Sequence, residues 1–365
     1  MAQFSADNIK NVVVRGTNWV GDSVMTVPAL RAIRRVLPQA KITLVLRPSA
    51  KGLFADADFI DELLVYDRRN MLAVIPQIRE WRKRKFELAI LLQNAFEAAL
   101  IPFLSGVPIR IGYATEARQS LLTHPLELPE WRSSKHEVFY YLYVVTALEQ
   151  LLYGTSTICE SDPDTSLNLS ALRKTEATDF LASHGINQDN PIVVICPGSI
   201  NSRAKRWPAE SFAKLSDQLR DEGRQVVVIG SKGEEDVSRE VTQRMRQKPV
   251  DLTGKTTIDQ ITAILGLADL VITNDTGPAH IAAALGRPTL VIFGPTNPLT
   301  TRPFSGQAEI LRHPPDCAPC MLRDCPIDHR CMTAITVEEV VGQSRAILKR
   351  GSFAKTVRSL CDTVA

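Results

Sequence analysis

The sequence predicts an α/β protein of two doubly wound, Rossmann-like domains that face a central cleft. Its 365 residues are more than one ordinary core holds. Short, continuously apolar runs alternate with amphipathic stretches, which is typical of parallel strands covered on both faces by helices. This alternation occurs twice along the chain, so we expect two domains of similar size.

The expected strands are 12–15, 42–46, 88–92, 109–113, 192–196, 226–230, 270–274 and 290–294. The clearest expected helices are 23–36, 209–221, 236–246 and 258–267. A polar stretch at 160–166 predicts the linker between a first domain over 1–168 and a second domain over 169–349. We expect a last helix, 350–365, to pack back on the first domain.

The composition is that of a soluble globular protein, with 44% hydrophobic and 23% charged residues. A net charge of +3 argues against a dedicated nucleic-acid binder. No apolar run is long enough to span a bilayer, and residues 1–10 lack the features of a secretion signal, so we expect a cytoplasmic location. Two basic clusters, 31–35 and 82–85, are either solvated helix faces or a surface for anionic lipid headgroups or a phosphorylated acceptor.

The loop after the first strand carries an acid where a phosphate-binding loop carries a lysine. Gly16 and Gly21 have P-loop spacing and Ser23 fits that motif, but Asp22 takes the lysine position. A carboxylate there would repel phosphates, and the dinucleotide-binding glycine pattern is absent. Asp22 is therefore either a plain helix N-cap or a general base that the helix dipole keeps ionised.

A turn near the end of the second domain predicts a diphosphate site. Residues 268–280 read as a strand, a turn and a helix start, and Pro278 suits the first helical turn. The amides of Thr276 and Gly277 are then available for an anion, while Asp275 caps the helix or holds a ribose hydroxyl. A plain capped turn is the alternative.

Two further turns in the second domain carry charge after a strand. The segment 197–208 contains Lys205, which we expect to stabilise a departing diphosphate, although an isolated Lys-Arg pair is usually just solvated. The segment 230–236 contains Glu234 and Glu235, which bind ribose hydroxyls or merely occupy a first helical turn.

Read in order, these motifs resemble glycosyltransferase family 9, the ADP-heptose:lipopolysaccharide heptosyltransferases, and most of all its heptosyltransferase II members. The matching segments are RGTNWVGDSVMTVPALRAIRR (15–35), CPGSINSRAKRWP (196–208), GSKGEEDV (230–237) and NDTGPAHIAAALGRPTLVIFGPTNP (274–298). They span both domains, and their joint order is more specific than any one of them.

The resemblance implies a GT-B fold and an inverting, metal-independent transfer of heptose from ADP-L-glycero-β-D-manno-heptose to the heptosyl-Kdo-lipid A inner core. It implies that the domain 1–168 binds the acceptor and the domain 169–349 binds the donor. It also implies Asp22 as the catalytic base and Lys205 as the phosphate-binding cation. The implied donor-binding residues are Ser199, Asn201, Lys205, Glu234, Glu235, Asp275, Thr276, Gly277 and His280. The implied acceptor-side loop comprises Arg15, Thr17, Asn18, Trp19 and Gly21.

The resemblance leaves some roles open. Either Glu234 or Glu235 lies near the adenosine ribose, and Ser199, Asn201 and Ser202 compete for one hydroxyl role. We expect no cofactor, no nucleic-acid partner and a monomer, with peripheral contact to the inner surface of the membrane that holds the acceptor.

Four of the seven cysteines are close together in sequence, at Cys317, Cys320, Cys325 and Cys331. This density, with His313 and His329 nearby, is compatible with structural zinc, but the spacings are shorter than in the usual two-knuckle pattern. We expect free thiols and no metal.

Two other functions remain open at this point. One is a GT-B transferase with another donor or acceptor, including heptosyltransferases I and III. The other is a nucleotide-sugar-binding scaffold of lipopolysaccharide assembly, which Asp22 disfavours because phosphate binding alone would prefer a cation.

Overall fold

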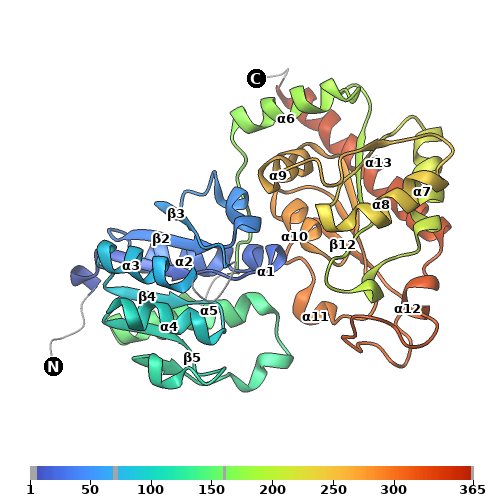
Figure 1. Ribbon diagram of the computed structural model, residues 1–365. Helices are drawn as coiled ribbons and strands as arrows, with labels where there is room; N and C mark the ends of the chain where they lie inside the picture. The colour runs from blue at the N-terminus through green and yellow to red at the C-terminus, as the bar shows by residue number, and fades with distance from the viewer. Residues whose placement is uncertain (1–5, 69–72, 159–161, 363–365) are drawn as a thin grey trace. The chain divides into compact units, whose positions relative to one another are not determined.

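The computed structural model describes residues 6–68, 73–158 and 162–362, with side chains up to Gly351. It divides into two compact units, Met1–Thr165 and Ser166–Ala365 (Figure 1). The expected linker, 160–166, lies at this division, but residues 160 and 161 are outside the described part. The assignment of acceptor to the first unit and donor to the second stays a prediction.

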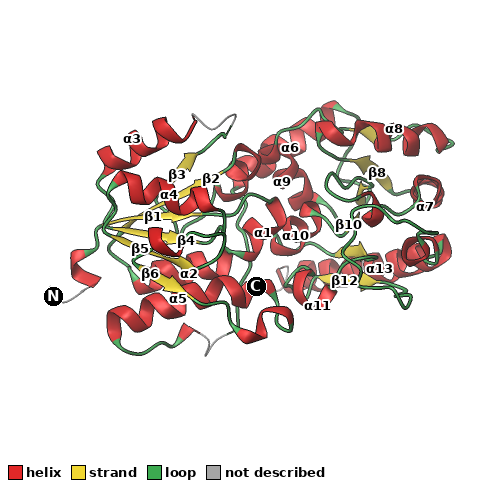
Figure 2. Cartoon of the chain, turned by 60° about the horizontal axis from the view of Figure 1, so that its bottom comes forward, coloured by secondary structure: helices red, strands yellow, loops and turns green. Residues whose placement is uncertain are grey.

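The first unit is a six-stranded parallel sheet in the order β3-β2-β1-β4-β5-β6. Its strands are β1 (Asn11–Arg15), β2 (Lys41–Leu46), β3 (Glu62–Val65), β4 (Leu88–Leu91), β5 (Ile109–Tyr113) and β6 (His124–Leu126). Its helices are α1 (Val20–Met25), α2 (Val27–Val36), α3 (Val74–Arg84), α4 (Phe96–Ser105) and α5 (Glu137–Tyr153). The sheet lies between α3 and α4 on one face and α2 and α5 on the other (Figure 2).

The second unit repeats this winding, with the order β12-β11-β10-β7-β8-β9 and parallel pairing throughout. Its strands are β7 (Ile192–Cys196), β8 (Gln225–Val228), β9 (Val250–Asp251), β10 (Leu270–Asn274), β11 (Thr289–Ile292) and β12 (Ala308–Leu311). Its helices are α6 (Ala171–Ser183), α7 (Ala209–Asp221), α8 (Glu235–Arg244), α9 (Ile258–Leu267), α10 (Gly277–Ala284), α11 (Pro298–Thr301), α12 (Arg330–Thr333) and α13 (Val337–Asp362).

Each sheet has one point where the direction of winding reverses. Strands β1 and β4 are neighbours in the first sheet, and β7 and β10 are neighbours in the second. The loops after these pairs leave the carboxyl edge in opposite directions, so they open a crevice in which doubly wound sheets bind ligands. The motif loops after β1, β7 and β10 all start at these reversal points.

The sequence predicted all eight inner strands and missed the four outer ones. The missed strands β3, β6, β9 and β12 are the edges of the two sheets, and their residues are only partly buried or exposed. An edge strand packs less of its surface than an inner strand, so it lacks the continuous apolar run that predicted the others.

The predicted helix 23–36 is wrong as a single element. The structure begins α1 at Val20 and starts a new helix, α2, at Val27, with Pro28 in its first turn. Proline has no amide to continue α1 and fits the first turn of the next helix, which places the break at Thr26.

The last helix, α13, is longer than expected and contacts α7 and β10 of the second unit. The side chains of residues 352–365 are outside the described part of the chain, so the predicted packing of 350–365 on the first domain is untested. No helix among the described residues is both long and apolar enough to cross a bilayer.

Trp207 joins the second core to the functional loops. Its side chain is 2% exposed and packs edge-on against Phe212 at 5.0 Å between ring centroids. Its indole Nε1 donates to the carbonyl oxygen of Ile335 at 2.9 Å. The ring therefore holds the end of the β7 loop against the core.

We expect Trp207→Ala to lower the free energy of unfolding by about 3–5 kcal/mol, because it leaves a large cavity and an unpaired carbonyl. Denaturant unfolding followed by circular dichroism measures this. Trp19→Ala is the control, since Trp19 is 57% exposed; equal losses in the two variants would contradict the assignment.

Candidate functional site

Asp22 lies in a pocket of the first unit at the β1/β4 reversal point. Trp19 is the N-cap of α1, so Asp22 is the third helical residue and not the N-cap that the sequence left open. Its carboxylate is in the first turn, where the helix dipole favours the charged form. The pocket holds about 180 Å³ and is lined by Thr17, Asn18, Trp19, Asp22, Leu92, Gln93, Asn94, Arg132, Glu137, Tyr140 and Tyr141.

The side chain of Arg15 holds the loop before Asp22 in place through hydrogen bonds. This side chain is 2% exposed, and it donates to the Gly16 carbonyl at 2.6 Å and to Asn18 Oδ1 at 3.0 Å. Burial and the nearby charge of Arg47 lower the pKa of Arg15 to about 10. Three of the predicted acceptor-side residues, Thr17, Asn18 and Trp19, line the pocket, whereas Arg15 and Gly21 do not.

A short hydroxyl chain fixes the loop to α1. The hydroxyl oxygens of Thr17 and Ser23 are 3.1 Å apart, and Ser23 Oγ donates to the Trp19 carbonyl at 2.9 Å. The Ser23 hydroxyl is thus engaged in hydrogen bonds within the protein, which agrees with the rejection of a P-loop at this position. The chain orients the turn that carries Asp22.

Helix α5 supplies a second charged group to the pocket. Arg132 Nη1 lies 2.6 Å from Glu137 Oε1, and the guanidinium also lies 4.0 Å above the Tyr140 ring. Burial raises the pKa of Glu137, and Arg132 opposes that rise. Burial also raises the pKa of Tyr141, and the charge of Asp22 adds to this, so Tyr141 presents a neutral phenol near the carboxylate.

The loop after β4 completes the pocket. Asn94 Nδ2 donates to the Tyr140 hydroxyl at 2.7 Å, while Arg118 Nη2 donates to Asn94 Oδ1 at 3.0 Å. Arg118 is fully buried and also binds the Gln93 carbonyl. Carboxylates, amides and aromatic rings in one pocket are groups that bind sugar hydroxyls and sugar ring faces.

Sequence reasoning missed the pocket residues outside the first loop. Gln93 and Asn94 follow a predicted inner strand directly, so their position was available as a signal. Arg132, Glu137 and Tyr140 come from a segment without a motif, and only the packing of α5 brings them to Asp22.

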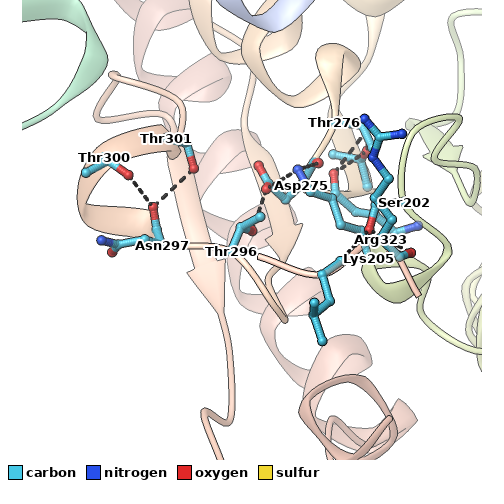
Figure 3. A network of polar contacts seen from close by, with 12 residues as sticks. Ser202, Lys205, Asp275, Thr276, Thr296, Asn297, Thr300, Thr301 and Arg323 are labelled. Carbon is cyan, nitrogen blue, oxygen red and sulfur yellow. Dashed lines mark hydrogen bonds and ion pairs between the residues drawn. The ribbon is translucent and has the colours of Figure 1, made fainter. Parts of the chain in front are cut away.

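At the other reversal point, Lys205 and Asp275 form an ion pair. Lys205 Nζ lies 2.8 Å from Asp275 Oδ2 and donates to the Asp275 carbonyl at 3.1 Å. Thr296 Oγ1 donates to the same carboxylate oxygen at 2.7 Å (Figure 3). Asp275 is buried, whereas Lys205 keeps a quarter of its side chain exposed, so the cation is held in place and still reachable.

The helix α10 starts at Gly277 as predicted, but Asp275 does not fill one of the two roles expected for it, that of the helix cap. Thr276 is the N-cap of α10, with Pro278 in the first turn, so Asp275 does not cap the helix. Its carboxylate binds Lys205 instead. The first amides of α10 have no intrahelical partner at a helix start, which is the arrangement that binds anions. The side chain of His280, near the start of α10, is buried.

Asn274 ties the β7 and β10 loops together. It is fully buried; its Nδ2 donates to the Pro197 carbonyl at 2.8 Å and its Oδ1 accepts from the Trp207 amide at 3.0 Å. Pro197 and Trp207 lie at the two ends of the β7 loop, whereas Asn274 is the last residue of β10. Asn274 therefore fixes both ends of the loop that carries Lys205 to the end of β10.

The three residues of the β7 loop that compete for one hydroxyl role differ in their burial and hydrogen bonds. Ser202 Oγ donates to the carbonyls of Leu322 and Arg323, both at 3.2 Å. Ser199 is buried and its carbonyl accepts from Arg206 at 3.0 Å, while Asn201 is exposed. Ser202 therefore holds the loop.

Glu234 lies beside the β7 loop and Glu235 does not. Glu234 Oε2 accepts from Ser231 N at 2.8 Å and Ser231 Oγ at 2.7 Å in a capping box at the start of the short helix Lys232–Glu234. A methyl group on Gly198 would come within 2.2 Å of Glu234 Oε1. A methyl group on Gly254 would instead meet the side chain of Glu235. Glu234 is thus the acid at the reversal point.

The cysteine-rich segment runs from Cys317 to Cys331 without long secondary structure. The pKa of Cys331 is raised to about 11, first by burial and then by Cys320, Cys325 and Cys317. Within the described residues, no three potential ligands are arranged to hold a metal ion. His313 contacts Glu339, and His329 contacts the Ala204 carbonyl.

Comparison with known proteins decides the family. The model of glycosyltransferase family 9 (heptosyltransferase) matches residues 75–330, most of the chain. The chain belongs to glycosyltransferase family 9. The family and enzyme class expected from the motifs are therefore confirmed.

The relatives of this family 9 glycosyltransferase match over nearly their full length. It is 28% identical over 313 residues to lipopolysaccharide heptosyltransferase 2 of Escherichia coli, covering 82% of this chain and 87% of that one. It is 28% identical over 319 residues to lipooligosaccharide heptosyltransferase 2 of Haemophilus influenzae, covering 83% and 88%.

Solved structures give the same result. The E. coli ADP-heptose lps heptosyltransferase II superposes with a TM-score of 0.79 at 25% identity, over 94% of this chain and 99% of that one. A family 9 glycosyltransferase of Veillonella parvula has the same TM-score and identity, over 93% and 97%. The predicted fold class, two doubly wound α/β domains of GT-B type, is confirmed.

The contact between Gly198 and Glu234 predicts an intolerance at one glycine. In Gly198→Ala the new methyl must displace the Glu234 carboxylate from Ser231, so we expect the free energy of unfolding to fall by about 1–3 kcal/mol. Gly233→Ala is the matched control, because a methyl there meets open space. Thermal and denaturant unfolding measure both; a Gly198 variant as stable as the control would contradict the contact.

Proposed function

We propose that this glycosyltransferase transfers L-glycero-D-manno-heptose from ADP-heptose to the heptosyl-Kdo-lipid A inner core of lipopolysaccharide. The observation that carries the proposal is Asp22, a carboxylate in a polar and aromatic pocket at a reversal point. The names of the relatives supply the sugar and the type of acceptor.

Asp22 is the general base of the proposed reaction. It takes the proton of the acceptor hydroxyl as that oxygen forms a bond to the anomeric carbon of the donor. The bond from this carbon to the β-phosphate oxygen breaks on the opposite side, so the anomeric configuration inverts and ADP leaves. The position of Asp22 in the first turn of α1, where the helix dipole favours a charged carboxylate, supports this role.

The β7/β10 reversal point holds the donor in this proposal. The amides at the start of α10, at Thr276 and Gly277, and the Lys205 ammonium stabilise the negative charge that develops on ADP. Asp275 keeps Lys205 in place. Glu234 binds a ribose hydroxyl, with Ser199, Asn201, Glu235 and His280 as further donor-side residues. Because these groups supply the required charge, the proposed transfer uses no metal and no cofactor.

The acceptor occupies the Asp22 pocket. Thr17, Asn18 and Trp19 contact it from the first loop, while Arg15 and Gly21 shape that loop. Asn94, Arg132 and Glu137 extend the set beyond the loop. We place the enzyme in the cytoplasm as a monomer, working at the surface of the membrane that carries the acceptor.

We expect Asp22→Asn to lower kcat by about two to four orders of magnitude while leaving the Kd of ADP nearly unchanged, because only proton removal is lost. Single-turnover transfer assays and calorimetric titration with ADP measure the two quantities. Asp189→Asn, an exposed acid in a loop, is the control. A variant with the wild-type kcat would refute the base assignment.

We expect Lys205→Ala to weaken ADP binding or kcat at least about tenfold, because one charge-assisted contact to the diphosphate is worth about 1.5–3 kcal/mol. Lys214→Ala is the matched control, since Lys214 pairs with Glu210 on the surface of α7. Unchanged kinetics in Lys205→Ala would remove Lys205 from the site.

A screen of ADP-heptose against other nucleotide sugars, on Kdo- and heptosyl-terminated cores, tests the proposed donor and acceptor.

A further inference from the structure

Helix α4 exposes an apolar stripe on the surface of the first unit. Phe96, Phe103 and Leu104 are 45%, 44% and 42% exposed, and Leu100 between them is partly exposed. Their spacing of i, i+4, i+7 and i+8 places them on one side of the helix. The outer side of a surface helix is normally polar.

The core of the first unit does not account for this stripe. The opposite side of α4 already packs on the sheet through Ala98, Ala99 and Ile101, next to the buried Trp81 of α3. The exposed stripe is therefore additional apolar surface, and clustered apolar surface of this kind marks an interaction site.

Helix α3 exposes a basic stripe with the same spacing. Arg79, Arg82 and Lys83 are exposed and follow the exposed Ile75 at i+4, i+7 and i+8. Arg82 Nη2 donates to the Leu104 carbonyl at 2.7 Å, which joins the basic stripe to the end of the apolar one. The two helices also lie side by side on one face of the sheet (Figure 1).

The charge of this face is positive. Residues 79–85 contain five basic side chains and one acid, Glu80. Arg84 pairs with Glu80 at 2.7 Å and with Glu62 at 2.6 Å, which leaves four cations for the surface. On α4, the carboxylate of Glu97 is occupied by Arg68 at 2.8 Å and the Tyr66 hydroxyl at 2.7 Å. Arg110 adds a further cation 5.4 Å above the Phe103 ring.

We propose that the α3–α4 face, defined by Ile75, Arg79, Lys83, Phe96, Phe103 and Leu104, docks on an anionic membrane surface. The apolar stripe of α4 enters the boundary between headgroups and acyl chains, and the cations of α3 contact lipid phosphates. Surfaces that bind membranes peripherally combine apolar side chains such as Phe and Leu with neighbouring Arg and Lys. The benefit to the enzyme rests on the proposed lipid-linked acceptor, since docking confines the enzyme to the surface that holds it.

Vesicle binding tests the docking face without either substrate. Purified protein is sedimented with vesicles of phosphatidylcholine alone and of phosphatidylcholine with phosphatidylglycerol. We expect binding to the anionic vesicles only, and we expect it to weaken as salt is added. In Arg79→Gln/Lys83→Gln, binding falls about fivefold for each cation removed. In Phe103→Ser/Leu104→Ser, it falls about tenfold or more.

Matched variants away from the face are the controls. Lys174→Gln/Lys248→Gln removes two exposed cations of the second unit, and Leu128→Ser/Leu172→Ser removes two exposed leucines. Thermal unfolding verifies that all four variants are folded. Wild-type protein that stays in solution with anionic vesicles would overturn the proposal, as would face variants that bind like the controls.

A second readout separates this proposal from the proposed function. Transfer to a delipidated, water-soluble heptosyl core is expected to stay within about twofold of wild type in the face variants, because the face is outside the Asp22 pocket. Loss of vesicle binding with normal soluble transfer supports docking. Vesicle binding without any transfer by the wild type would sink the proposed function and leave docking intact.

Discussion

The reversal of winding in each sheet is the constraint on which the candidate site depends. Adjacent parallel strands whose connections leave in opposite directions cannot cover their own carboxyl ends, so a crevice opens there. In the first unit the crevice lies at β1 and β4 and contains Asp22; in the second it lies at β7 and β10 and contains Lys205. The same strand order thus produces two crevices of different chemistry, because the loops differ while the sheets do not.

Buried polar side chains hold these loops in register. Asn274, Asp275 and Arg118 each connect segments distant in sequence, and each is almost completely buried. Burial of such groups is costly unless every partner is present, so they specify one arrangement of the loops. Surface groups such as Lys205 and Trp19 then take defined positions without being buried themselves.

The sequence predicted the inner strands and the motif loops well, and the edges and helix breaks poorly. Inner strands are apolar on both faces, so they appear as continuous runs, whereas β3, β6, β9 and β12 are half-covered and do not. Pro28 was visible in the sequence, but the apolar spacing around it continued through Thr26. The missing amide of Pro28 ends α1 at Met25 and lets α2 start at Val27.

The sequence by itself determined the family, the two-domain α/β class and the reversed charge at Asp22, because each depends on residue types at fixed local spacing. Only the tertiary structure decided which acid lies beside Gly198, that Asp275 holds Lys205 instead of capping α10, and that Arg132 and Glu137 join the Asp22 pocket. It also decided that the basic run of α3 lies against the apolar stripe of α4. These pairings join residues tens of positions apart, and packing of helices on the sheets, not local spacing, brings them together.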